Sequence, residues 1–179
     1  MKTDLIKCKD KDLIDRILNP STKEKAFREL LKYMHEPIYF HLRKMLGNHE
    51  DSADATQNTF IQVNSSLSSF KGASKLSTWI YTIATRKGID LIKKRKSFLS
   101  IEDTEQSLLS DSYFDGNEAE IKLLAAILTL PAKQRAVFVL KYFEDLDYKS
   151  ISEATGTSIG ALKASFHHAK EKIKPLINS

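Results

Sequence analysis

Apolar residues recur every three or four positions along most of this chain, which is the spacing of one face of an α-helix. The first clear stripe consists of Phe27, Leu30, Leu31, Met34, Ile38, Leu42 and Met45. Ser21 and Glu24 precede it with the spacing of a capping box, and Pro37 is expected to kink or split the helix. Gly47 is expected to end this helix, and Asn48 to cap the next one.

The same period predicts the remaining helices. One carries Ala53 to Val63 and fades at Ser65–Ser69, and a loop is expected at residues 70–75. A long helix should then run over residues 76–96, with Leu76, Trp79, Ile80 and Ile83 facing inward. The helical period is lost after residue 97 and resumes near Glu118 in a helix that stops at Leu130-Pro131. Three further helices are expected at Ala132–Phe143, Tyr148–Ala154 and Ser158–Lys174. Because the pattern contains no strand of any length, we predict an all-α fold.

Charge divides the chain into three parts. Residues 1–97 hold 19 Lys and Arg against 11 Asp and Glu, a net charge of +8. Residues 98–120 hold seven acids and no cation, and residues 121–179 hold nine cations against five acids. We therefore predict two small helical domains, residues 1–97 and 121–179, joined by a flexible acidic linker at 98–120. Two basic bodies indicate a polyanion partner, although solubility alone also explains such a pattern.

The cysteine count and the lengths of the apolar runs indicate the cellular compartment. A single cysteine, Cys8, excludes an internal disulfide and favours a reducing compartment. The sequence has no apolar run near the roughly 20 residues that span a bilayer, and Met1–Asp4 opens without a signal-peptide core. We expect a cytoplasmic protein without direct membrane insertion.

The last three predicted helices have the turn and cap residues of a helix-turn-helix. Gly156 supplies a residue that tolerates positive φ in the turn, Ser152 is small enough for a close helix crossing, and Ser158 can cap the last helix. The expected core is Ile151, Ile159, Leu162, Val137 and Leu140, with Tyr142 or Phe143. A helical hairpin with a glycine cap is the alternative. If the motif is real, the outward residues of the last helix can enter the major groove of DNA.

Taken in order, several segments resemble the extracytoplasmic-function (ECF) group of sigma-70 family RNA polymerase sigma factors. They are Asp54-Ala55-Thr56-Gln57-Asn58-Thr59-Phe60, Phe70-Lys71-Gly72, Thr78-Trp79-Ile80-Tyr81, Ile83-Ala84, Asp90 with its basic tail, Leu130-Pro131 with Gln134-Arg135, and Gly156 with Gly160-Ala161-Leu162-Lys163. The resemblance covers nearly the whole chain.

The resemblance implies a subunit that binds core RNA polymerase and directs promoter-specific initiation. Residues 1–97 would be sigma region 2, which grips the clamp helices of the polymerase β′ subunit and reads the −10 element. Residues 121–179 would be region 4, which reads the −35 element and sits on the β flap. The implied polymerase contacts are Asp54, Gln57, Asn58, Phe60 and Ile61. The implied −10 contacts are Lys71, Lys75, Arg86, Lys93, Lys94 and Arg95. The implied −35 contacts are Ser158, Gly160, Ala161, Lys163, Ala164, His167, His168 and Lys170. An anti-sigma factor is a further partner that the resemblance implies.

Some positions depart from the family pattern or allow a second interpretation. Asn58 replaces the usual acid, Arg86 an asparagine, and Ala164-Ser165 a Ser-Arg pair, so the promoter sequence cannot be transferred from relatives. Phe60 can equally be a core residue, and Trp79 fits the core better than a base-stacking platform. Lys93 to Lys96 span more than one helical turn, so only two or three of them can face phosphate together.

Two other classes of function compete with the sigma factor. A stand-alone helix-turn-helix regulator would bind duplex DNA without polymerase, but it has no need of the Asp54–Phe60 segment. An enzyme is disfavoured because the five histidines lack ligand spacing such as His-Glu-x-x-His. We therefore predict no catalytic residue, no metal and no cofactor.

Overall fold

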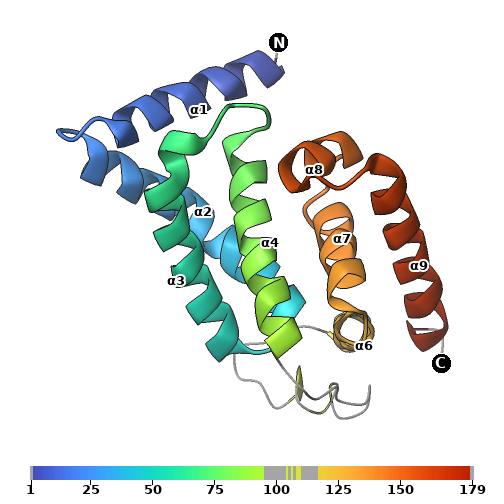
Figure 1. The fold of residues 1–179 in the computed structure, drawn as a ribbon. Coiled ribbons are helices and arrows are strands. Elements are labelled where there is room, and N and C mark those ends of the chain that lie inside the picture. Colours follow the sequence, from blue (N-terminus) through green and yellow to red (C-terminus); the bar gives the residue numbers. More distant parts are fainter. Residues whose placement is uncertain (1, 95–103, 105, 107, 110–116, 178–179) are drawn as a thin grey trace.

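All the regular structure in the described part of the chain is helical (Figure 1). The computed structural model describes residues 2–94, 104, 106, 108–109 and 117–177, and for residues 2–9 and 154 only the backbone. The elements in chain order are α1 Lys2–Leu18, α2 Lys23–Leu46, α3 His49–Ser66, the 3-10 helix η1 Leu67–Ser69, α4 Leu76–Lys94, α6 Glu118–Leu128, α7 Ala132–Tyr142, α8 Tyr148–Thr155 and α9 Ile159–Ile177. The predicted all-α fold is confirmed. Most of the predicted linker, together with Arg95 and Lys96, lies outside the described residues.

Helices α1 to α4 form one half of the molecule. In Figure 1, α2, α3 and α4 lie side by side, and α1 crosses one end of them. Their core is made by the predicted apolar stripes, because Ile38, Leu42 and Ile80 are fully excluded from solvent. Leu76 and Ile83 are also buried, and Trp79 packs against the same core.

The end of α2 follows the prediction. Gly47 adopts a left-handed conformation with φ of 81°, and its N–H donates to the Arg43 carbonyl at 2.9 Å. The Asn48 side-chain oxygen then accepts from the Asp51 N–H at 2.9 Å, which caps α3. Two local signals thus produce a sharp turn between antiparallel neighbours.

The start of α2 differs from the prediction. Thr22, not Ser21, stands at the N-cap, and it makes no capping bond to the helix. Ser21 bonds instead to the Asn19 side-chain oxygen, through its N–H at 3.0 Å and its hydroxyl at 2.8 Å. The predicted capping box between Ser21 and Glu24 is therefore wrong, because Asn19 competes for the serine in the turn after α1.

Pro37 does not split α2, which continues from Lys23 to Leu46. Proline removes the N–H that would bond to the carbonyl of Tyr33 four residues earlier. Both residues are exposed, with Tyr33 at 67%, so water can reach that carbonyl. The helix tolerates the proline because it lies on the solvent face.

Helices α6 to α9 form the second half. Gly156 ends α8 with φ of 70°, and its N–H donates to the Ser152 carbonyl at 2.8 Å. The Ser158 hydroxyl accepts from the Ala161 N–H at 3.3 Å at the start of α9. The predicted turn and cap of the helix-turn-helix are confirmed. Its core contains Val137, Leu140, Ile151 and Leu162, as predicted.

One predicted core position, Ile159, is wrong, and of the alternatives Tyr142 and Phe143 it is Phe143 that packs against the core. Ile159 is 40% exposed and Tyr142 57% exposed. Ile159 is the first residue of α9, and Phe143 lies just after α7.

One apolar core joins the two halves. It includes Leu42 and Ile80 from the first half and Ile127, Phe138 and Val139 from the second. Helix α4 packs against both α7 and α8, and α2 packs against α6 and α7 (Figure 1). The predicted domains therefore lie directly against each other in this structure.

Candidate nucleic-acid and partner surfaces

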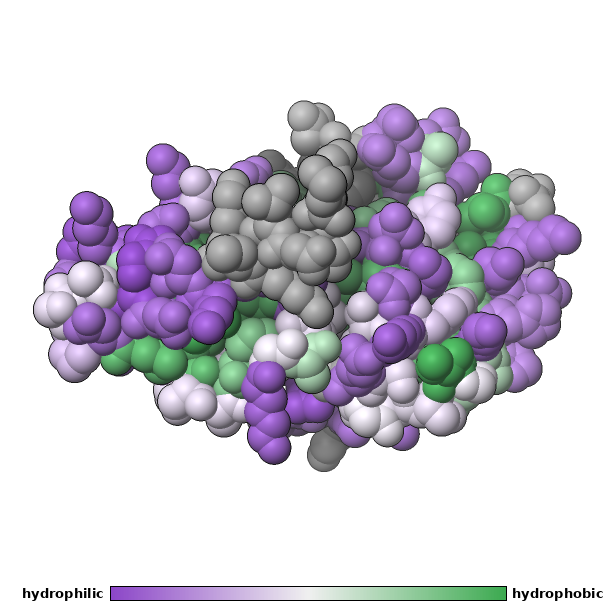
Figure 2. All heavy atoms as spheres, turned by 90° about the horizontal axis from the view of Figure 1, so that it is seen from above, coloured by the Kyte–Doolittle hydropathy of each residue, from purple (hydrophilic) through white to green (hydrophobic). Residues whose placement is uncertain are grey.

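Helix α3 presents a mixed polar and apolar stripe to solvent. Asp54, Gln57, Asn58 and Ile61 are all exposed, and their spacing of three and four residues places them on one helical face. Ile61 is 61% exposed and is one of several large apolar side chains that reach solvent, on a surface that is mostly polar on the face in Figure 2. An apolar side chain bordered by polar groups on one helical face can be buried at the centre of a protein contact.

Phe60 lies on the other face of α3. It is only 5% exposed, and its ring stacks on that of His35 with 6.1 Å between ring centroids. The structure thus places Phe60 in the core, which was the alternative interpretation, and it supports the stripe from behind. Ile61 is the apolar side chain that a partner can reach.

The loop at residues 70–75 carries two exposed cations, Lys71 and Lys75. Gly72 in the loop has φ of 69°, and a side chain added there would meet no atom within 4 Å. The loop is open to solvent on the side of these lysines. An exposed basic loop of this kind can accept a single strand of nucleic acid.

Helix α4 carries three further cations of the predicted −10 set. Arg86, Lys93 and Lys94 are exposed, whereas Arg95 lies outside the described residues. Lys93 and Lys94 occupy the last turn of α4. Trp79 packs in the core and tilts against Phe70 at 5.2 Å between ring centroids, as its core interpretation requires.

The outward face of α9 is open. The predicted −35 residues are all exposed: Ser158, Gly160, Ala161, Lys163, Ala164, His167, His168 and Lys170. A side chain added at Gly160 would meet nothing within 4 Å. Small residues followed by Lys163 and Lys170 let the N-terminal half of the helix approach base edges closely while the cations reach phosphate.

Arg135 connects the two halves through backbone carbonyls. Its guanidinium, 5% exposed, donates from Nη1 to the Met45 carbonyl at 2.7 Å and from Nη2 to the Leu130 carbonyl at 3.1 Å. Nη2 also donates to the Leu128 carbonyl. These carbonyls lie in the last turn of α2, the last turn of α6 and the turn before α7. One side chain of the second half therefore binds the end of a helix in the first.

A second connection is centred on Glu144, just after α7. Its carboxylate lies 3.4 Å from Nδ1 of the fully buried His41 and 3.6 Å from Nζ of Lys44, both on α2. The Tyr81 hydroxyl of α4 donates to the same carboxylate. On its far side, His41 Nε2 lies 2.8 Å from the Thr85 hydroxyl. Glu144 thus joins two helices of the other half.

Burial sets the protonation of this cluster. It lowers the pKa of His41, against the opposing pull of Glu144, so His41 is neutral at pH 7. Burial alone would raise the pKa of Glu144, but the hydrogen bond from His41, the charge of Lys44 and the Tyr81 hydroxyl lower it below its usual value. Burial and the negative charge of Glu144 raise the pKa of Tyr81. The carboxylate is therefore ionised.

These interdomain residues were absent from the sequence prediction. His41 lies between Ile38 and Leu42 on the apolar face of α2, a position that could have marked it as buried. Arg135 was recognised as part of a motif, but its three carbonyl partners lie up to 90 positions away. Contacts at such separation leave no local pattern.

The described residues contain neither a candidate metal site nor a candidate membrane span. Among these residues no three His, Cys, Asp or Glu side chains are grouped so that they could hold a metal ion. No helix among them is long and apolar enough to cross a membrane.

An open helix-turn-helix beside a second helical half with exposed cations defines a two-part DNA-binding protein. Comparison with known proteins identifies its family. The family model for sigma-70 region 2 matches residues 30–98, and that for sigma-70 region 4 matches residues 120–173. The chain is 33% identical to the ECF RNA polymerase sigma factor SigW of Bacillus subtilis (strain 168) over 163 residues, which cover 83% of this chain and 87% of SigW. It is 25% identical to the RNA polymerase sigma-H factor of Pseudomonas aeruginosa, covering 92% of this chain and 91% of that protein.

The chain belongs to the sigma-70 family and, within it, to the ECF group of RNA polymerase sigma factors. Its fold matches that of CnrH solved with the cytosolic domain of CnrY, with a TM-score of 0.71 at 20% identity over 94% of this chain and 97% of that one. It also matches the sigma factor RpoE solved with the anti-sigma factor NepR from Bartonella quintana, with a TM-score of 0.66 at 21% identity over 86% of this chain and 98% of that one. The sigma factor is thus favoured over the stand-alone regulator. Sigma factors are not enzymes, in agreement with the prediction that the chain has no catalytic function.

Proposed function

We propose that this sigma factor binds core RNA polymerase through the exposed α3 stripe and then directs initiation by contacting two promoter elements. The proposal assigns residues 1–97 to polymerase and the −10 element, 98–120 to the linker, and 121–179 to the −35 element. We also propose that the protein acts in the cytoplasm and that an anti-sigma factor is a further partner. The single observation that carries the proposal is the exposed face of Asp54, Gln57, Asn58 and Ile61, because it lies outside the helix-turn-helix, where DNA binding by a stand-alone regulator does not require it.

The α3 stripe fits a helical partner. Asp54 and Gln57 stand one turn apart, and Asn58 and Ile61 continue the same face for a second turn. A long partner helix or coiled coil can align with such a strip and bury Ile61 at its centre. This geometry suits the clamp helices of the polymerase β′ subunit, and we place the contact there.

The two DNA surfaces differ in chemistry. The loop with Lys71 and Lys75, continued by Arg86 and the end of α4, suits an unstacked single strand, which is the form that the −10 element takes during melting. The α9 surface is a helix with small residues first and cations later, which suits the major groove of a duplex −35 element. The β flap is the proposed polymerase contact of this second half.

In-vitro transcription tests the proposal. The full chain is combined with bacterial core polymerase on a library of random promoters, and the start sites are sequenced. We expect transcripts that share a pair of −35 and −10 elements, lost in the double variant Asp54→Ala and Gln57→Ala and kept in Glu171→Ala, an exposed acid on α9. If the wild type gives no transcripts but binds duplex DNA tightly by itself, the assignment of polymerase binding is wrong.

A further inference from the structure

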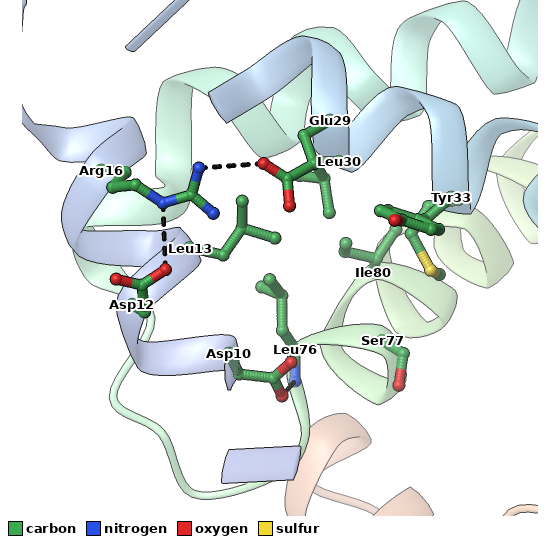
Figure 3. A pocket seen from close by; sticks show the side chains of 11 residues that line it. Asp10, Asp12, Leu13, Arg16, Glu29, Leu30, Tyr33, Leu76, Ser77 and Ile80 are labelled. Atoms are coloured by element: carbon green, nitrogen blue, oxygen red, sulfur yellow. Dashed lines mark hydrogen bonds and ion pairs between the residues drawn. The ribbon is translucent and has the colours of Figure 1, made fainter. Parts of the chain in front are cut away.

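Helix α4 receives its cap from a distant helix. It begins at Leu76, and Lys75 before it carries only hydrogen-bond donors on its side chain. The first N–H groups of a helix need acceptors from outside the helix. The Leu76 N–H donates to the Asp10 carboxylate of α1 at 3.0 Å, and Figure 3 shows the two groups facing each other.

Helix α1 is fixed independently of this contact. The Arg16 guanidinium donates to Glu29 of α2 at 2.9 Å and to Asp12 of its own helix at 3.0 Å. Ile17 is buried in the core at 2% exposure. A cavity of about 660 Å³ lies between these groups and Leu76, with Asp10 at the α4 side (Figure 3). The carboxylate of Asp10 thus reaches α4 from a helix that is anchored elsewhere.

The cap holds one end of the proposed −10 loop. At the other end, the Phe70 N–H donates to the Leu67 carbonyl at 3.0 Å, and the Phe70 ring rests against Trp79. Residues 71–75 lie between these two anchors, with both lysines exposed. Because the loop is short and fixed at each end, the position of its lysines depends on the start of α4.

We propose that Asp10 is a positioning residue for −10 recognition, which it serves by capping α4 and so fixing the loop that carries Lys71 and Lys75. Asp10 does not touch DNA. A carboxylate at a helix N-terminus is also favoured by the helix dipole. Helix α1 lies outside residues 30–98 that the region 2 family model matches, so that match does not assign this role. The inference rests on the proposed function.

The test compares three variants in holoenzyme with bacterial core polymerase, on promoters selected by the wild type. Asp10→Ala removes the cap, Asp10→Asn retains an oxygen acceptor, and Asp15→Ala removes an exposed charge from the same helix without touching α4 or the Arg16 contacts. The readout is permanganate reactivity of thymines in the −10 element. We expect Asp10→Ala to reduce strand opening about three- to tenfold, the loss typical of an N-cap, and the other two to stay near the wild type.

Two measurements separate positioning from a general loss of structure. Affinity for core polymerase and for −35 duplex should be unchanged in Asp10→Ala, and losses there in proportion to the loss of opening would overturn the proposal. Equal opening by Asp10→Ala and Asp15→Ala would overturn it too. In the wild-type chain, with no substitution, the Leu76 amide should exchange slowly with deuterium, and fast exchange would refute the cap. A wild-type holoenzyme that opens no promoter would instead refute the proposed function.

Discussion

Replacing Arg135 with methionine should destabilise the protein far more than the same change elsewhere on α7. Methionine keeps an unbranched apolar side chain, but it is shorter than arginine and has no donor, so the Met45, Leu128 and Leu130 carbonyls lose the guanidinium that binds them. Arg135 is 5% exposed, and water cannot readily replace it. The damage should reach both halves, because one of the three carbonyls belongs to α2.

The size of the effect follows from the number of bonds. Each buried carbonyl left without a donor costs about 1–3 kcal/mol, and the apolar methionine recovers part of this through packing. We expect a net loss of about 3–5 kcal/mol in the free energy of unfolding. For a chain of this length each kcal/mol lowers Tm by about 2–4 °C, so Tm should fall by about 6–20 °C.

Calorimetry and urea unfolding of the full chain measure this loss. Lys133→Met is the matched control, because Lys133 lies two residues away on α7, carries the same charge and is exposed. Its effect should stay within about 0.5 kcal/mol. Arg135→Lys keeps the charge but cannot reach three carbonyls at once, so it should fall between the two. If Arg135→Met loses no more stability than Lys133→Met, the assignment of the three hydrogen bonds is wrong.

Three further predictions concern pH, the turn and salt. Stability should fall as pH drops below about 6.5, because burial lowers the pKa of His41 and only the unfolded chain then takes up the proton. The slope, at most about 1.4 kcal/mol per pH unit, should flatten in His41→Asn, and an unchanged slope in urea titrations would exclude His41 as its source. Gly156→Ala should lower the free energy of unfolding by about 1–2 kcal/mol, because residue 156 has a positive φ. Gly160→Ala within α9 should stabilise the protein slightly. Thermal unfolding measures both variants, and equal effects would contradict this reasoning. If about six cations meet phosphate, log affinity of the holoenzyme for promoter should fall with log salt at a slope of about −5, and Lys163→Ala should reduce that slope by about 0.9. A slope near zero in filter-binding assays counts against the DNA surfaces.

Local signals predicted the elements well, because each depends on a few adjacent residues. Gly47 and Gly156 adopt the left-handed conformation that the turns require, and Asn48 and Ser158 cap the helices that follow them. The Ser21 motif failed although it was intact, because the Asn19 side-chain oxygen accepts the Ser21 N–H that Glu24 would have bonded. A capping motif predicts a helix start only when no neighbour competes for it.

Sequence could not predict which surfaces meet. Asp10 and Leu76 are 66 positions apart, and His41 and Glu144 are 103 apart, so their pairing depends on the packing of whole helices. The candidate site was predictable where it needed only exposure and helical spacing, as on α9. The helical spacing allowed Phe60 to lie either on the partner-binding face or in the core. Only the packing of α3 against α2 and α4 decides between these two positions.

The polar contacts between the halves are of a kind that can be exchanged for water. Glu144 is ionised and Lys44 is partly exposed, so both become hydrated if the halves separate, and neither is left buried without a partner. Arg135 would lose the Met45 carbonyl and keep those of Leu128 and Leu130, which belong to its own half. The main cost of separation is therefore the shared apolar core around Phe138 and Val139. Meanwhile the lysines of the 70–75 loop and the outer face of α9 are exposed in the packed state, whereas Tyr81 on α4 is held by Glu144. Any step of promoter recognition that needs the Tyr81 side of α4 must first part the two halves, whereas initial attraction to DNA phosphate need not.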